Sequence, residues 1–128
     1  MKRLLLDTHT LLWWLIDHPD LGKKAKAAIA DVRNHVYVSA ASTWEISIKR
    51  ALGKLSVPND MHAIIEDEGF SELPISLYHG DQAGQLPDFH KDPFDRMLIA
   101  QAQSEGLILV THDQDISKYA VRTMAAKH

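Results

Sequence analysis

The chain has 128 residues, 45% hydrophobic and 24% charged, which are proportions typical of one globular domain with a single substantial core. Its net charge of −3 argues against a protein that grips nucleic acid through basic side chains alone, so a phosphate ligand would need another source of positive charge. The chain has no cysteine, which excludes disulfides, thiolate metal sites and cysteine nucleophiles and agrees with a cytoplasmic protein.

The N-terminus shares some features with a secretory signal peptide, because a basic start is followed by a leucine-rich stretch up to Ile16. Asp7 and His9 interrupt this stretch, and no small-residue cleavage site follows it. The stretch is also too short and too polar to span a membrane. We therefore expect no membrane association, and interpret the segment as a buried strand over residues 4–6 that ends at Asp7 and leads into a helix over 8–16.

Two further helices and a strand are expected next. The apolar face of the first helix would contain Leu21, Ala25, Ala28, Ile29 and Val32. A strand over 36–39 follows. Ser42 and Glu45 have the spacing of a capping box, which predicts the start of the next helix. Its apolar side would carry Trp44, Ile48, Ala51 and Leu52.

The second half of the chain continues the alternation of helices and strands. We expect a helix from about 60 to Gly69, an edge strand over 71–75, a helix over 76–86 and a loop over 86–90. The clearest strand covers 107–110, and a last strand lies near 121–124. This pattern predicts an α/β fold, a three-layer α/β/α sandwich around a mainly parallel sheet, formed by a single domain over residues 1–128.

The segment that begins at Asp92 has the sequence of a helix start. The Asp92 side chain can accept from the first free N–H groups, and Pro93 suits the first helical position because its missing donor costs nothing there. Asp95 would occupy the third position, near the positive end of the helix dipole. Helix capping and the dipole are enough to explain both acids. A functional role for them is therefore indicated only by the acids elsewhere in the chain.

Five carboxylates from four segments are expected to meet at one edge of the sheet. Asp7 and Asp113 directly follow buried strands, Glu45 would lie in the first turn of a helix after a strand, and Asp92 and Asp95 open another helix. In an open α/β sheet, ligands bind outside the carboxyl ends of the strands. We assume that the Asp92 helix begins at that same edge because it would feed a parallel strand.

Carboxylates this close would raise each other's pKa and weaken the fold unless they were paired, protonated or bound to a cation. Basic residues nearby are few, namely Lys49, Lys91 and Arg96, so a divalent cation is the simplest answer, and oxygen ligands favour Mg²⁺ or Mn²⁺ over Zn²⁺. Structural roles remain open: Glu45 could pair with Lys49, and Asp113 could cap a turn.

Aromatic residues near these acids are the other feature of interest. Eight histidines are scattered without the H-x-x-x-H or H-x-H spacing of a histidine metal site, and only His9 and His112 flank the proposed ligands. Trp13 and Trp14 could stack on bases, or could pack in the core and against a partner. No P-loop, G-x-S-x-G or G-x-G-x-x-G motif occurs.

Four sequence blocks together resemble the PIN domain, and more narrowly the VapC-type toxins of bacterial toxin–antitoxin pairs. They are Leu-Leu-Asp7-Thr8-His9, Ser42-Thr43-Trp44-Glu45-Ile46, the run from His90 to Ala102 with its Asp-Pro-Phe-Asp-Arg core, and Val110-Thr111-His112-Asp113. The resemblance covers essentially the whole chain, in order. It implies an endoribonuclease that uses Mg²⁺ or Mn²⁺ to hydrolyse RNA, an antitoxin partner and a homodimer.

The resemblance also implies roles for single residues. The catalytic, metal-binding acids would be Asp7, Glu45, Asp95 and Asp113. Supporting roles would fall to Asp92, Thr8, Thr111, Arg96 and, less firmly, Asp115. The two threonines would orient carboxylates by hydrogen bonding. Apart from the resemblance, Lys49, Lys54 and Arg96 are basic groups that could contact RNA, and the two lysines could equally be ordinary solvated surface residues.

Two other functions compete with this interpretation. One is a Mg²⁺-dependent phosphatase or phosphotransferase with Asp7 as the nucleophile, although the second aspartate usual in such enzymes is here His9. The other is a non-enzymatic, receiver-like signalling module, which would need an acidic pair after the first strand and a lysine at a late strand end. Neither feature is evident.

Overall fold

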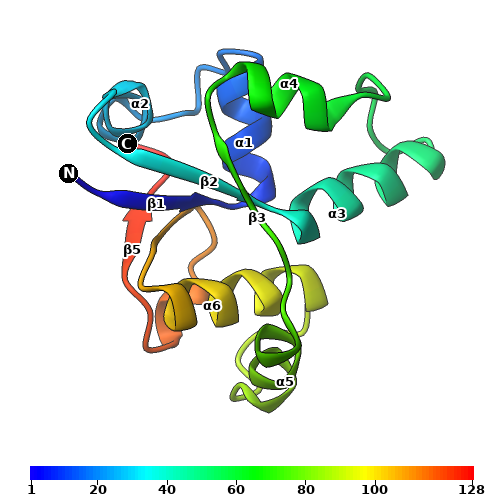
Figure 1. The fold of residues 1–128 in the computed structure, drawn as a ribbon, viewed down its shortest axis with the longest axis vertical. Coiled ribbons are helices and arrows are strands. Elements are labelled where there is room, and N and C mark those ends of the chain that lie inside the picture. The colour runs from blue at the N-terminus through cyan, green and yellow to red at the C-terminus, as the bar shows by residue number, and fades with distance from the viewer.

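A computed structural model describes residues 1–128 and shows one five-stranded sheet with helices on both faces (Figure 1). The strands are β1 (Arg3–Leu6), β2 (His35–Ser39), β3 (Ser71–Leu73), β4 (Ile108–Thr111) and β5 (Thr123–Ala125). Their order is β3-β2-β1-β4-β5, and all four pairings are parallel. The predicted α/β/α sandwich is confirmed, with a sheet that is parallel throughout and β3 at its edge.

Six α-helices and one 3₁₀ turn connect these strands. The helices are α1 (Thr8–Leu15), α2 (Lys23–Ala30), α3 (Ala40–Ala51), α4 (Met61–Asp67), α5 (Leu77–Gln85) and α6 (Pro93–Glu105), and the 3₁₀ turn covers Ile116–Lys118. In Figure 1, α1, α2 and α4 lie on one side of the sheet, and α5 and α6 lie on the other. No helix is both long and apolar enough to cross a lipid bilayer.

Strand β1 shows why the sheet is covered on both faces. Leu4 and Leu6 belong to the hydrophobic core beneath α1, α2 and α4, whereas Leu5 belongs to the core beneath α6. All three side chains are fully buried. Successive residues of a strand point to opposite faces, so burial of all three means that both faces of the sheet are covered here. A continuous apolar run is therefore the expected sequence of this central strand.

The strand order places a crevice at the carboxyl edge, between β1 and β4. The chain moves from β1 to β2 and β3 on one side, and then returns to place β4 on the other side of β1. Loops that leave two neighbouring strands in opposite directions open a crevice at such a switch point. Asp7 follows β1 and Asp113 lies two residues after β4, so both acids lie at this crevice.

The capping box predicted at Ser42 and Glu45 is wrong. Helix α3 begins at Ala40, and its N-cap is Ser39, the last residue of β2, whose hydroxyl accepts from the Ala41 N–H at 3.0 Å. The strand runs directly into the helix with no loop between them. Ser42 and Glu45 therefore lie inside α3, and Glu45 falls in its second turn and not its first.

Two apolar faces and one strand boundary also differ from the structure. Helix α2 ends at Ala30, so Val32 lies outside it and is 95% exposed instead of facing the core. The Trp44 and Leu52 side of α3 faces outward, because the core side of that helix carries Ala41 and Ile46 instead. The last strand, β5, begins at Thr123, two residues later than expected.

Candidate metal centre

A cleft of about 450 Å³ opens at the carboxyl edge of the sheet, and five acids line it. They are the acids singled out in the sequence: Asp7, Glu45, Asp92, Asp95 and Asp113. The rest of the lining is Thr8, His9, Leu12, Lys49, Lys54, Leu55 and His112. Segments far apart in the chain thus supply one acidic cavity, and α6 does begin at the edge where β1 and β4 end.

Asp7 has a structural contact as well as a place in the cleft. Its Oδ1 accepts from the Thr10 N–H at 2.8 Å and so caps α1, while its own N–H donates to the Val110 carbonyl. The residue is only 6% exposed. One carboxylate oxygen is thus held by the helix start, and the backbone holds the residue against β4.

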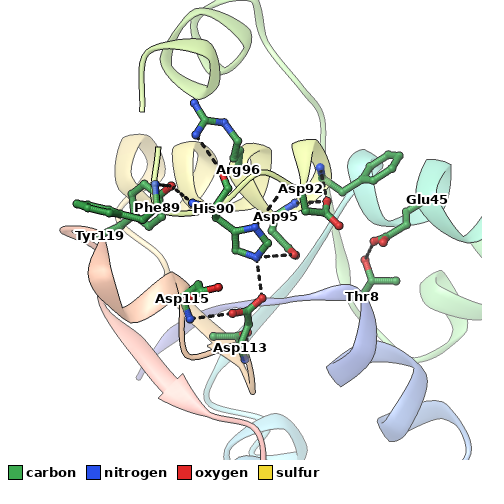
Figure 2. Close-up of polar contacts among 12 residues, drawn as sticks. Thr8, Glu45, Phe89, His90, Asp92, Asp95, Arg96, Asp113, Asp115 and Tyr119 are labelled. Carbon is green, nitrogen blue, oxygen red and sulfur yellow. Dashed lines mark hydrogen bonds and ion pairs between the residues drawn. The ribbon is translucent and has the colours of Figure 1, made fainter. Parts of the chain in front are cut away.

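Glu45 is nearly as buried, at 6% exposure, and both of its oxygens have partners. The Thr8 hydroxyl donates to Oε1 at 2.6 Å (Figure 2). On the other side, Lys49 Nζ lies 2.9 Å from Oε2. Thr8 also lies 3.1 Å from the Ser42 hydroxyl. These contacts join α1 to α3 and fix the direction in which the Glu45 carboxylate points.

The start of helix α6 supplies two more acids of the rim, as predicted. The Asp92 side chain accepts from the N–H groups of Phe94 and Asp95 at 2.8 and 3.2 Å, and Pro93 occupies the first helical position. Burial raises the pKa of Asp95 to about 7, with contributions from the charges of Asp92, Asp7 and Glu45. His90 opposes this rise but does not cancel it. Asp95 is therefore the acid on which repulsion between these carboxylates is concentrated.

Asp113 is held by the turn that follows β4. Its N–H donates to the Thr111 hydroxyl at 3.0 Å, and its Oδ1 accepts from the Asp115 N–H at 2.8 Å. The Asp115 side chain itself pairs with Lys118 at 2.9 Å, and neither Asp115 nor Thr111 lines the cleft. Thr111 thus fixes the backbone of Asp113, whereas Asp115 contributes only its main chain.

His90 is the residue that the sequence analysis missed. Its Nε2 lies 2.7 Å from Asp113 Oδ2 and 3.2 Å from Asp95 Oδ2, so the ring bridges two of the acids (Figure 2). Burial lowers the pKa of His90, but the hydrogen bond to Asp113 and the charges of Asp95, Asp113 and Asp92 outweigh burial and raise it. The available signal was its position in the loop that leads to the Asp92 cap.

The backbone restricts what His90 can do at this site. Its Nε2 and one oxygen each of Asp95 and Asp113 lie within 4.8 Å of one another, close enough to share an ion. However, the Asp92 N–H donates to Nδ1 at 3.1 Å, which places the ring proton on Nε2. In this conformation His90 donates to the carboxylates, so the acids are the better metal ligands and the ring holds them in place.

Arg96 turns away from the cleft and fastens the loop that carries His90. Its guanidinium donates to four backbone carbonyls at 2.9 to 3.2 Å, those of Ala83, Leu86, Pro87 and His90. Tyr119 binds the same loop, since its hydroxyl accepts from the N–H groups of Phe89 and His90 (Figure 2). With its donors used in this way, Arg96 supports the site and is not placed to contact RNA.

Comparison with known proteins identifies the fold family. The model of the PIN domain matches residues 4–122. The chain belongs to the PIN domain family. The resemblance found in the sequence, which includes the Asp-Pro-Phe-Asp-Arg block, is thus confirmed at the level of the family.

Individual relatives agree with this assignment. The chain is 39% identical to Ribonuclease VapC16 of Mycobacterium tuberculosis over 70 residues, a match that spans 48% of this chain and half of that protein. The crystal structure of DNA-bound VapBC from Salmonella typhimurium superposes with a TM-score of 0.68 at 18% identity, covering 97% of this chain and 98% of that one. FitAcB from Neisseria gonorrhoeae gives a TM-score of 0.68 at 18% identity and covers 96% and 97%.

Arg96→Lys tests the support of the His90 loop. A lysine cannot reach four carbonyls with one ammonium group, so we expect the free energy of unfolding to fall by about 1–3 kcal/mol. Calorimetric titration should also show weaker Mn²⁺ binding, because Asp92 and His90 would lose their fixed positions. Arg122→Lys, at an exposed arginine without side-chain contacts, is the matched control. Equal stability of the two variants in urea would contradict the proposed role.

The raised pKa of Asp95 predicts how the metal-free protein depends on pH. Because the folded-state pKa of about 7 lies above the model value of 3.8, the folded state binds the proton more tightly, and stability should fall as pH rises through this window. The full shift corresponds to at most roughly 4 kcal/mol.

Thermal unfolding in EDTA between pH 5 and 8 measures this effect. Asp95→Asn should unfold several degrees higher than the wild type at pH 8 and should show a flatter pH profile. Asp67→Asn, which removes an exposed charge on α4, should follow the wild type. A wild-type melting temperature that rises across this range would mean that the pKa of Asp95 is not raised in the folded protein.

Proposed function

We propose that this chain is a Mg²⁺- or Mn²⁺-dependent endoribonuclease, the toxin of a toxin–antitoxin pair, that hydrolyses RNA phosphodiester bonds. The observation that carries the proposal is the gathering of five carboxylates in one cleft of a PIN domain. Asp7, Asp95 and Asp113 would be the principal metal ligands. Glu45 would hold a second ion or position the attacking water.

The donor set suits a hard divalent cation. The acids offer oxygen ligands, and the pKa of about 7 leaves Asp95 partly protonated near neutral pH when no cation is present. A bound cation would favour the ionised form of these acids and remove the repulsion between them. When bound, the ion would lower the pKa of water and stabilise the charge of the phosphate under attack.

The remaining side chains would keep the ligands in place. Thr8 holds Glu45 through its hydroxyl, and Lys49 balances the charge of that carboxylate. His90 donates between Asp95 and Asp113, and thus keeps them within reach of one ion. Hydrogen bonds of this kind from surrounding groups restrict ligand orientation and improve metal affinity.

The competing functions have less support. A phosphotransferase would use Asp7 as a nucleophile, but Asp7 Oδ1 caps α1 and the carboxylate lies among four other acids that would repel an unshielded phosphate. A receiver-like module would not require these additional acids. Membership of the PIN domain family also favours the nuclease.

The proposed partners are RNA and an antitoxin protein that inhibits the enzyme. Relatives named Ribonuclease VapC16 and DNA-bound VapBC support these partners, although the sequence match to VapC16 spans only half of each protein. RNA as the substrate would place the activity in the cytoplasm. We also propose a homodimer, because Ile75, Leu77 and Tyr78 at the start of α5 are 40%, 93% and 60% exposed.

Asp7→Asn tests the proposed activity. The amide can still accept from the Thr10 N–H and cap α1, but it removes the negative charge that a cation needs. We expect cleavage of single-stranded RNA in Mg²⁺ or Mn²⁺ to fall at least 100-fold with little loss of stability. EDTA should have the same effect on the wild type.

The control is Asp67→Asn, which should cleave as fast as the wild type. Gel analysis of an end-labelled RNA, with circular dichroism to verify folding, provides the measurement. Wild-type cleavage rates in folded Asp7→Asn would contradict the proposal, as would cleavage that survives EDTA.

The dimer is tested at the exposed face of α5. The double variant Leu77→Ser, Tyr78→Ser should elute as a monomer in size-exclusion chromatography with light scattering, whereas the wild type should have the mass of two chains. Val32→Ser removes an equally exposed apolar side chain elsewhere and should remain dimeric. If the α5 variant also remains dimeric, the two chains meet on another surface.

A further inference from the structure

A cluster of aromatic rings surrounds Trp13 beside the acidic cleft. The Trp13 ring is stacked on His18 at 5.5 Å between centroids and on His9 at 6.2 Å, with interplanar angles of 18° and 30°. His112 lies 5.9 Å away at 42°. Segments on both sides of the β1–β4 switch point therefore contribute rings to one cluster.

The cluster reaches the cleft through two of its members. His9 and His112 are exposed and line the cleft, next to Asp7 and Asp113 in the sequence. Trp13 is partly buried and packs against the hydrophobic core beneath α1. The two exposed rings thus have a rigid support behind them, and they face the space where a ligand of the metal centre would extend.

Internal polar contacts do not account for these two histidines. The other buried or partly buried histidines are engaged: His18 accepts from the Asp20 N–H, His79 contacts Glu105, and His90 bridges two acids. The imidazoles of His9 and His112 make no hydrogen bond or ion pair within the chain. Both rings are exposed in the cleft, so they are free to contact a ligand there.

We propose that His9 and His112, backed by Trp13, form a stacking site for the base of the nucleotide next to the scissile phosphate of single-stranded RNA. The proposal rests on the proposed nuclease function and names a contact that the acids cannot make. Aromatic faces bind any base by stacking, and only unpaired bases can be splayed onto them. Apolar Leu12 and Leu55 complete this part of the cleft.

The positive groups of the cleft agree with this placement. Lys49 and Lys54 also line it, and they come from α3 and the turn that follows, not from the segments that carry His9 and His112. Lysines attract the phosphate backbone, whereas the imidazole and indole rings attract bases. An RNA strand bound at the metal centre would have both kinds of group within the same cavity.

Binding of two oligonucleotides separates the base from the backbone. The first is a fluorescein-labelled single-stranded RNA hexamer, and the second is the same backbone with abasic sugars. Fluorescence anisotropy in Ca²⁺ should give wild-type binding of the hexamer about tenfold tighter than that of the abasic strand. His9→Ala and His112→Ala should each reduce hexamer affinity about five- to tenfold and leave abasic affinity unchanged.

Matched variants distinguish stacking from other roles. His9→Phe and His112→Phe keep a flat ring and should retain hexamer binding, and His62→Ala, at an exposed histidine of α4 away from the cleft, should match the wild type. If a variant binds the abasic strand as tightly as the wild type does, the rest of its binding site is intact. In NMR spectra, the ring protons of His9 and His112 should shift upfield with the hexamer and not with the abasic strand.

Several results would overturn the stacking site. One is a wild type that binds both strands equally or binds neither. Another is a loss of affinity in the phenylalanine variants as large as that in the alanine variants, which would indicate hydrogen bonding by imidazole. Gels of the same samples in Mg²⁺ test the nuclease function separately. Base-dependent binding through these histidines without cleavage would retain the stacking site and reject the nuclease.

Discussion

Repulsion between buried carboxylates is the constraint on which this structure depends. Five acids share one cleft, and Asp7 and Glu45 are each only 6% exposed. Water cannot screen charges well at such depth, so the cost appears in the pKa of Asp95, raised to about 7 first by burial and then by its neighbours. A fold that kept such a cluster for stability alone would be better served by apolar residues. The cluster is therefore consistent with the proposed cation site.

The protein limits this repulsion with contacts that also build the fold. Asp7 and Asp92 each cap a helix, so part of their charge is directed at backbone N–H groups. Lys49 balances Glu45, and His90 bridges Asp95 and Asp113. These partners leave the cluster incompletely neutralised, since the pKa of Asp95 remains raised to about 7. The charge that remains would favour a bound cation.

The acidic centre and the aromatic cluster meet at one edge because of the strand order. Asp7 with His9, and Asp113 with His112, leave β1 and β4 at the switch point, so each segment carries an acid and a ring to the same cleft. Arg96 and Tyr119 act from outside the cleft by fastening the loop that holds His90. The geometry of the proposed metal centre therefore also depends on residues that lie outside the cleft.

Local signals in the sequence were sufficient for the fold and for most of the acids. The apolar run at Leu4–Leu6 identified a central strand, and the Asp92-Pro93 pair identified the start of α6, because strand burial and helix capping depend on neighbouring residues. The parallel sheet then required acids at the strand ends to share an edge. The start of α3 was predicted three residues too late, because Ser39 can cap directly from the end of β2 while Ser42 shows the more familiar pattern.

Only the tertiary structure decided which partners each acid has. His90 bridges Asp95 and Asp113, which lie 5 and 23 positions away, and nothing in the spacing of the histidines indicates such a contact. The sequence likewise allows Arg96 to contact RNA, whereas in the structure its guanidinium donates to loop carbonyls. Contacts of this kind depend on how the loop over residues 86–92 folds back on α6 and the β4 turn. That packing depends on the whole molecule and cannot be deduced from the residues that neighbour the loop in the sequence.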